Sequence, residues 1–171
     1  MEEFKKIFVK ISDRLLKVLG GICAAVMAAL TLSVLWGVGT RYLFGAQASF
    51  TEELARMLLI VSTFFGGAYA FGTGAHIGLD FLASRMEKSA RGLCLAIARV
   101  ASILFCVLVL SIGGIMLVDT SMQSGNRLVS MPIYMWEIYL CVPISGVLAT
   151  IFLLSDFMRE SKKDNRQEEI L

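Results

Sequence analysis

One histidine and one nearby carboxylate are the residues of this sequence whose types and spacing most resemble those of a metal-binding or catalytic site. His76 and Asp80 are four residues apart, so on a helix they share a face and could form a hydrogen bond. His76 is the single histidine, so it cannot supply paired haem ligands or a multi-histidine metal site. We therefore favour a polar pair at a helix end over metal binding, and we expect no metal and no cofactor.

The sequence shows no pattern for catalysis or nucleotide use. It has no phosphate-binding glycine loop of the G-x-x-x-x-G-K-[ST] type, so nothing indicates direct use of ATP. The four cysteines are far apart and form no C-x-x-C pair, which favours small buried residues over a redox site. The formal net charge of +2 gives no argument for a nucleic-acid partner. We expect a protein that is not an enzyme.

Two neighbouring glutamates follow a helix-start signal. Ser49-Phe50-Thr51-Glu52 fits the S-x-x-E capping box, in which serine and glutamate bind each other's backbone amides, so a helix should begin near Phe50. Glu52 is four residues before Arg56, a spacing that allows an ion pair. Structural capping alone could explain Glu52. Glu53 has no part in the capping box, so it is the better candidate for a contact with a partner.

Small residues recur at every fourth position further along the same predicted helix. This spacing places them on one slowly drifting helical face, where they allow another helix to approach closely. Packing within the chain and packing against a partner protein are about equally compatible with the spacing. The row consists of Ser62, Gly66, Ala70, Gly74 and Gly78.

One carboxylate and two prolines mark the last apolar segment. Glu137 stands just before a run without formal charge and is the one acid that could serve a proton-coupled exporter. Its place near a helix end argues against that role. Pro132 fits the start of a helix, and Pro143 should kink or loosen the helix that contains it.

Four apolar segments are long enough to cross a membrane. The 171 residues are 57% hydrophobic and 18% charged, which is too apolar for a soluble domain. The 23 residues of 18–40 contain no charge and would form a helix of roughly 34 Å, enough for the hydrocarbon core. We predict an all-α membrane protein with a single membrane domain over 1–171. Its spans are expected at about 18–40, 57–79, 100–118 and 133–155.

Two further segments are amphipathic and should lie at the membrane interface. In 4–17, apolar residues recur at alternating spacings of four and three, with lysines on other faces. In 82–99, an apolar stripe lies opposite three basic residues and could lead directly into the third span.

The distribution of positive charge predicts the orientation. Of the 16 lysines and arginines, thirteen lie before the first span, between the second and third spans, or after the fourth. The other two connections hold three. The positive-inside rule therefore places both termini in the cytoplasm and the first and third connections in the periplasm.

Three short motifs, in order along the chain, resemble the small permease subunits of tripartite ATP-independent periplasmic (TRAP) transporters. Each fragment alone is weak, but the ordered set is fairly specific. The motifs are Arg41-Tyr42-Leu43-Phe44 followed by Ser49-Phe50-Thr51-Glu52-Glu53-Leu54-Ala55-Arg56, then Gly74-Ala75-His76-Ile77-Gly78-Leu79-Asp80, and then Met131-Pro132 with Pro143.

The resemblance implies a division of labour in the bacterial inner membrane. A soluble periplasmic protein would capture an organic acid, and a large membrane subunit would carry the acid with sodium. This chain, surrounded by membrane lipid, would brace the large subunit and could help to dock the periplasmic protein. The alternative is a stand-alone four-helix exporter coupled to protons, for which Glu137 would be the carboxylate.

Overall fold

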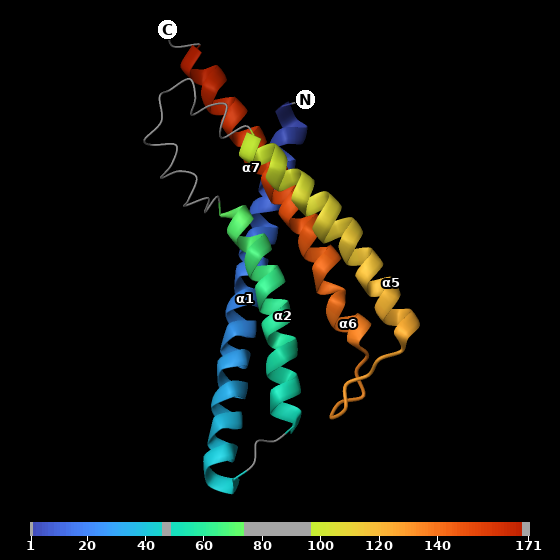
Figure 1. Cartoon of the computed structure of the whole chain (residues 1–171). Helices are drawn as coiled ribbons and strands as arrows, with labels where there is room; N and C mark the ends of the chain where they lie inside the picture. Colours follow the sequence, from blue (N-terminus) through green and yellow to red (C-terminus); the bar gives the residue numbers. More distant parts are fainter. Residues whose placement is uncertain (1, 46–48, 74–96, 169–171) are drawn as a thin grey trace.

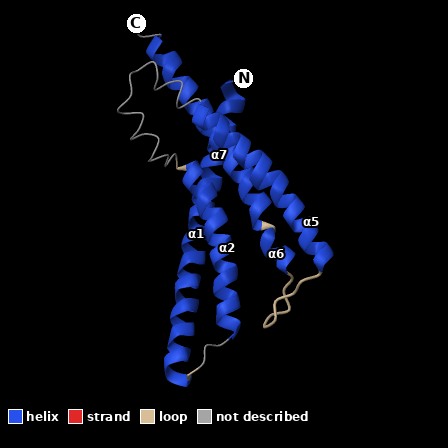
Figure 2. Ribbon diagram, viewed as in Figure 1, coloured by secondary structure: helices blue, strands red, loops and turns tan. Residues whose placement is uncertain are grey.

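Four long apolar segments, all helical, make up most of the described part of the molecule. The structure is a computed structural model and describes residues 2–45, 49–73 and 97–168. The segments long and apolar enough to span a membrane are Ile7–Phe44, Ser49–Gly72, Ile97–Ser124 and Met135–Phe157. The prediction of an all-α membrane protein with four spans is confirmed, and Figure 2 shows helices throughout the described part of the chain apart from its connecting loops.

The first two spans are uninterrupted helices. Helix α1 runs over Glu2–Phe44, so the amphipathic segment 4–17 is a direct continuation of the first span. At about 1.5 Å per residue, its 43 residues extend about 64 Å, roughly twice the thickness of the hydrocarbon core. Helix α2 runs over Ser49–Gly72 and begins one residue before the predicted start. Most of the predicted segment 82–99 lies outside the described residues.

The third and fourth spans are segmented. The third begins at Ile97 and passes through a π-helical stretch, η1 (Phe105–Gly113), into α5 (Gly114–Ser124). The fourth consists of α6 (Met135–Tyr139) and α7 (Cys141–Glu168), separated at Leu140. The predicted loosening at Pro143 is confirmed, because this proline has no N–H for the carbonyl of Tyr139, the residue at which α6 ends.

Pro132 does not stand at a helix start. It lies in the loop before α6, which begins at Met135 after the extended residue Tyr134. Backbone bonds within the loop replace helical ones at this point, so the expectation from sequence was wrong by three residues.

The helices form two pairs that meet at one end. Figure 1 shows α1 beside α2, and α5 beside α6 and α7. We call the end of the bundle with Glu2 and Glu168 the terminal end, and the end with Phe44, Ser49 and the 126–135 loop the loop end. The pairs cross toward the terminal end and diverge toward the loop end (Figure 1).

The core lies in the half of the bundle nearer the terminal end. All four spans contribute apolar side chains to it, and Phe152 is 2% exposed. Burial of such side chains, with close packing, holds the two pairs together there. The buried cluster consists of Leu19, Ala68, Cys106, Ala149, Phe152 and Leu153.

Glycines permit the closest helix contacts. A Cβ placed on Gly146 of α7 would lie 2.7 Å from Ser111 Oγ and 2.9 Å from the Ser111 backbone nitrogen. A Cβ on Gly114 would lie 2.9 Å from the nitrogen of Pro143. The third and fourth spans therefore touch nearly backbone to backbone at two successive levels.

Candidate functional site

The loop between the third and fourth spans has a defined fold. Gly125, with φ +61°, ends α5 in the left-handed conformation that glycine adopts without strain. Beyond it, the amide of Leu128 donates a hydrogen bond of 3.1 Å to the carbonyl of Ile133. The amide of Met135 donates one of 3.1 Å to the carbonyl of Asn126. These bonds fold residues 126–135 back on themselves. We call this segment the 126–135 loop.

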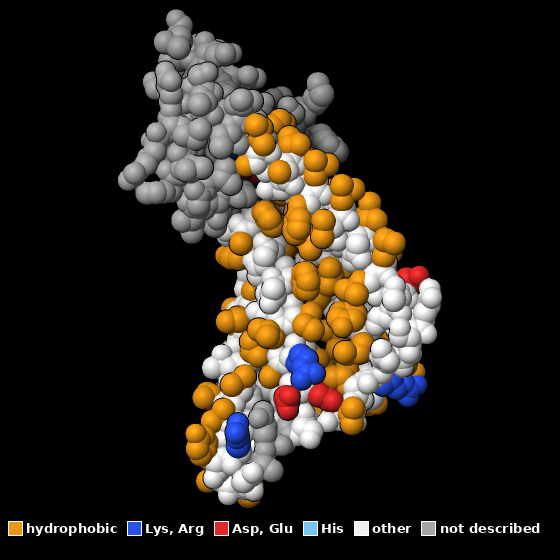
Figure 3. Space-filling view, in the orientation of Figure 1, with side chains coloured by type: hydrophobic (Ala, Val, Ile, Leu, Met, Phe, Trp, Pro, Cys, Tyr) orange, Lys and Arg blue, Asp and Glu red, His pale blue; other side chains and the backbone are white. Residues whose placement is uncertain are grey.

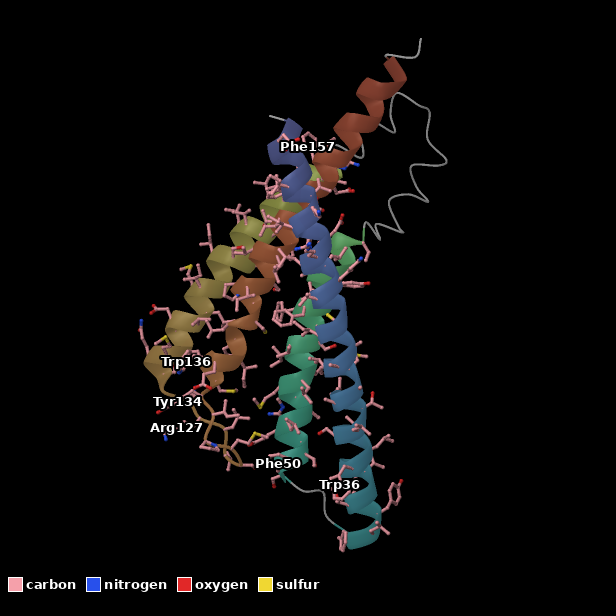
Figure 4. All side chains as sticks on the ribbon, turned by 180° about the vertical axis from the view of Figure 1, so that it is seen from behind. Trp36, Phe50, Arg127, Tyr134, Trp136 and Phe157 are labelled. Atoms are coloured by element: carbon pink, nitrogen blue, oxygen red, sulfur yellow. The ribbon has the colours of Figure 1, made fainter. Side chains whose placement is uncertain are left out.

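Aromatic and cationic side chains brace the base of this loop. The Arg127 guanidinium donates a hydrogen bond to the Tyr134 hydroxyl, and its central carbon lies 4.2 Å from the centre of the Tyr134 ring. The Tyr134 and Trp136 rings are tilted, with centres 6.4 Å apart. Figure 4 shows these three residues together at the loop end, opposite Phe157.

Glu53 joins the two helix pairs across the loop end. Its Oε1 accepts a hydrogen bond of 3.1 Å from the amide of Val129, and its Oε2 accepts one of 2.8 Å from the amide of Ser130. Hydrogen bonds to an ionised carboxylate are among the stronger ones in proteins. Glu53, predicted as a candidate for a contact with a partner, is thus engaged within the chain, where it holds the tip of the 126–135 loop.

Glu52 has a separate, local partner. Its Oε1 lies 3.2 Å from the Arg56 guanidinium on the next turn of α2, which confirms the predicted ion pair. Both side chains are largely exposed, so the pair adds little to stability. The capping hydrogen bonds of Ser49 stay a prediction. Figure 3 shows charged side chains gathered near the loop end of an otherwise apolar face.

The small-residue row is only partly within the described residues. The Ser62 hydroxyl lies 3.0 Å from Met27 Sδ, which links α2 to α1. Further along, a Cβ on Gly66 would meet nothing within 4 Å in the described part of the chain, and Ala70 is exposed. This part of the row is therefore open, and the internal packing of α2 uses Ala68 and Gly72 instead. Gly74 and Gly78 lie outside the described residues.

The other candidate residues that the structure describes are not brought into a common site. His76 and Asp80 lie outside the described residues. Arg41 is exposed in the last turn of α1, and Glu137 is exposed in the first turn of α6. Within residues 2–45, 49–73 and 97–168, no three of the cysteines, aspartates and glutamates come together as metal ligands would.

Sequence reasoning missed the partner of Glu53 and the two close glycine contacts. The unused carboxylate of Glu53 was the one signal for the first. Gly114 and Gly146, each inside an apolar span, were signals for the second, because glycine is unfavourable in a helix unless something approaches it closely.

Four long apolar helices, exposed over most of their surface, define a multi-pass membrane protein. Comparison with known proteins identifies its kind. The family model described as "Tripartite ATP-independent periplasmic transporters, DctQ component" matches residues 30–163. The chain belongs to this family of small permease subunits, which are multi-pass proteins of the inner membrane.

Two curated relatives illustrate the likeness. The sialic acid TRAP transporter small permease protein SiaQ of Vibrio cholerae is 30% identical over 129 residues, which are 74% of this chain and 71% of that protein. The C4-dicarboxylate TRAP transporter small permease protein DctQ of Rhodobacter capsulatus is 26% identical over 104 residues, covering 61% of this chain and 45% of that protein.

Proposed function

We propose that this chain braces the large, sodium-coupled membrane subunit of a TRAP transporter and helps to dock its periplasmic binding protein. Membership of the family supports a role within a tripartite assembly. The observation that carries the bracing role is how little of the first three spans is buried within the chain. In their most apolar stretches 11%, 6% and 11% of the residues are buried, against 50% in the fourth span.

Exposed apolar side chains alone would suit lipid as well as protein. Small residues distinguish a surface that faces protein from one that faces lipid. Glycine gives no advantage to a helix that faces lipid, whereas it allows a neighbouring helix to approach closely. Gly66 and the adjacent Gly67 have open space where a side chain would stand, and Ala70 follows on the same face. We therefore assign this face of α2 to the large subunit and the remaining apolar surface to lipid.

The polar loop end suits the periplasmic side. The start of α1 and the end of α7 lie at the opposite end of the bundle (Figure 1), where the sequence concentrates lysine and arginine. We therefore assign the termini to the cytoplasm. The 126–135 loop would then face the periplasm, where Glu53 fixes it in position to meet the binding protein.

The substrate is proposed to be an organic acid. The names of the two relatives state sialic acid for one and C4-dicarboxylate for the other, and both are acids. Choice among acids would lie with the binding protein and the large subunit. A sodium or carboxylate pathway needs oxygen ligands or cations near the membrane midplane, and this chain's spans offer mainly single hydroxyls.

Proteoliposome uptake tests the proposal. The chain is reconstituted with a large TRAP subunit and a binding protein, and uptake of radiolabelled acid is measured with and without a sodium gradient. Uptake should require all three components and the gradient. Omission of the small subunit should lower the yield of folded large subunit.

The stand-alone exporter makes the opposite prediction. It would need transport by this chain alone, driven by a proton gradient and abolished by Glu137→Gln. The exposed position of Glu137 in the short helix α6 gives that reading no support. Transport by the chain alone would overturn the bracing role.

A further inference from the structure

Two irregular points in the second helix pair lie against each other. In the third span the π-helical stretch η1 ends at Gly113, and the amide of the next residue, Gly114, is shared between the carbonyls of Leu110 and Ser111. In the fourth span the helix is interrupted at Leu140, ahead of Pro143. Gly114 and Pro143 are in close contact, so both spans are irregular at the same level.

Such points are where helices bend. Sharp kinks in helices occur at π-helical turns and at prolines, and a proline also removes one hydrogen bond of the helix. The first helix pair contrasts with this, because α1 and α2 are each uninterrupted over 43 and 24 residues. Bending between the core and the loop end is therefore concentrated in the second pair.

The moving part, on this geometry, would comprise α5, the 126–135 loop and α6. Its terminal-end boundary is the contact of Gly114 with Pro143, and beyond that boundary lies the apolar core. At the loop end it is bound to the first helix pair by the two hydrogen bonds to Glu53. Figure 4 shows the loop beside the α2 end that carries Phe50.

We propose that the second helix pair carries a hinge at Gly114 and Pro143, and that the Glu53 carboxylate is the latch that holds its loop-end half against α2. The latch is closed in this structure. Release of the Val129 and Ser130 amides lets α5, the 126–135 loop and α6 swing away from the first pair as a unit. The device belongs to the chain itself and does not depend on the proposed partners.

Distance measurement between two spin labels tests the latch. Labels are introduced as unnatural amino acids at Tyr42 and Val129, which are 86% and 96% exposed, in the full chain in lipid nanodiscs. We expect one narrow distance distribution for the unsubstituted protein. Glu53→Gln should add a longer population and raise the ratio of open to latched molecules about tenfold, the effect of one lost hydrogen bond.

A second variant removes the donor instead of the acceptor. Ser130→Pro has no amide hydrogen to give to Glu53, and it should produce the same longer population. Glu52→Gln is the matched control, because Glu52 pairs with Arg56 on its own helix and should leave the distribution unchanged. A second label pair at Val18 and Phe157, both exposed, reports the terminal end and should stay narrow in every variant.

The hinge is tested by adding a second substitution to the Glu53→Gln variant. Pro143→Ala restores the amide that the Tyr139 carbonyl lacks, so it should make the fourth span continuous and suppress the long population of Glu53→Gln. A single narrow distribution in both Glu53→Gln and Ser130→Pro would overturn the latch. Persistence of the full open population in Glu53→Gln with Pro143→Ala would overturn the hinge.

Discussion

The Glu53 carboxylate and the Ser130 amide nitrogen are 2.8 Å apart, although 77 residues separate them along the chain. Together with the Val129 amide, this contact links the N-terminal part of α2 to the loop that precedes α6.

Because of this link, the two adjacent glutamates should contribute unequally to the stability of the folded protein. Glu53→Ala leaves two backbone amides without their acceptor and should lower the free energy of unfolding by about 1–2 kcal/mol. Glu52→Ala removes an exposed ion pair and should change it by less than about 1 kcal/mol. Reversible unfolding in mixed detergent micelles measures both. Equal losses would contradict the assignment of the link to Glu53.

The two glutamates should also differ in how strongly they affect transport. At equal abundance in the membrane, Glu53→Gln should impair uptake by the complete transporter more than Glu52→Gln does. The reason is that the amide replaces one of the two acceptors holding the 126–135 loop, whereas Glu52 acts within α2. Initial uptake rates in proteoliposomes decide the order. Unimpaired uptake by both variants would mean that the position of the 126–135 loop does not affect transport.

Glycines at two places should respond oppositely to a methyl group. Gly146→Ala places a Cβ against the backbone of Ser111 and should destabilise the folded chain by about 1–3 kcal/mol. Gly66→Ala meets open space within the chain and should be neutral or slightly stabilising, because alanine is the better helix former. Thermal unfolding of the isolated protein compares the two. A neutral Gly146→Ala would mean that the third and fourth spans separate readily.

A larger substitution at the open position tests assembly. Gly66→Leu should leave the isolated chain stable, because nothing in the described part of the chain lies within 4 Å of a Cβ placed at Gly66. It should reduce co-purification with the large subunit, because the bulk prevents close helix approach. Complex yield at matched expression is the measurement. An undiminished yield would remove this face of α2 from the interface.

Orientation can be read with fusion reporters. Fusions after Leu171 or near Lys88 should report cytoplasm, and those in 45–48 or 124–126 should report periplasm, as the charge distribution predicts. Paired phosphatase and fluorescent-protein fusions give opposite signals on the two sides. A periplasmic signal after Leu171 would reverse the topology.

Local patterns in the sequence were sufficient for much of the fold. Long uncharged runs specified four spans, and the start of α2 and the Glu52–Arg56 pair followed from spacings of three or four residues. Pro143 indicated a weak point in the fourth span, since its effect on the preceding turn is intrinsic to proline.

Contacts between distant segments could not be predicted in the same way. Glu53 was recognised as unused by its own helix, but its partners are backbone amides, which no residue type reveals. The pairing of Gly146 with Ser111 depends on how two spans cross, which spacing within one span does not determine. The row of small residues indicated a close approach without saying which helix makes it.

The position of the core has a consequence for how the molecule comes apart. Apolar burial is concentrated in the half nearer the terminal end, whereas two hydrogen bonds accepted by one carboxylate join the two helix pairs at the loop end. Resistance to opening should therefore be graded along the bundle axis. Amide hydrogens around Phe152 should exchange only when the whole chain unfolds, and those of the 126–135 loop by small, frequent fluctuations. The periplasmic half, as we assign it, would be the yielding part of a subunit anchored by its cytoplasmic half.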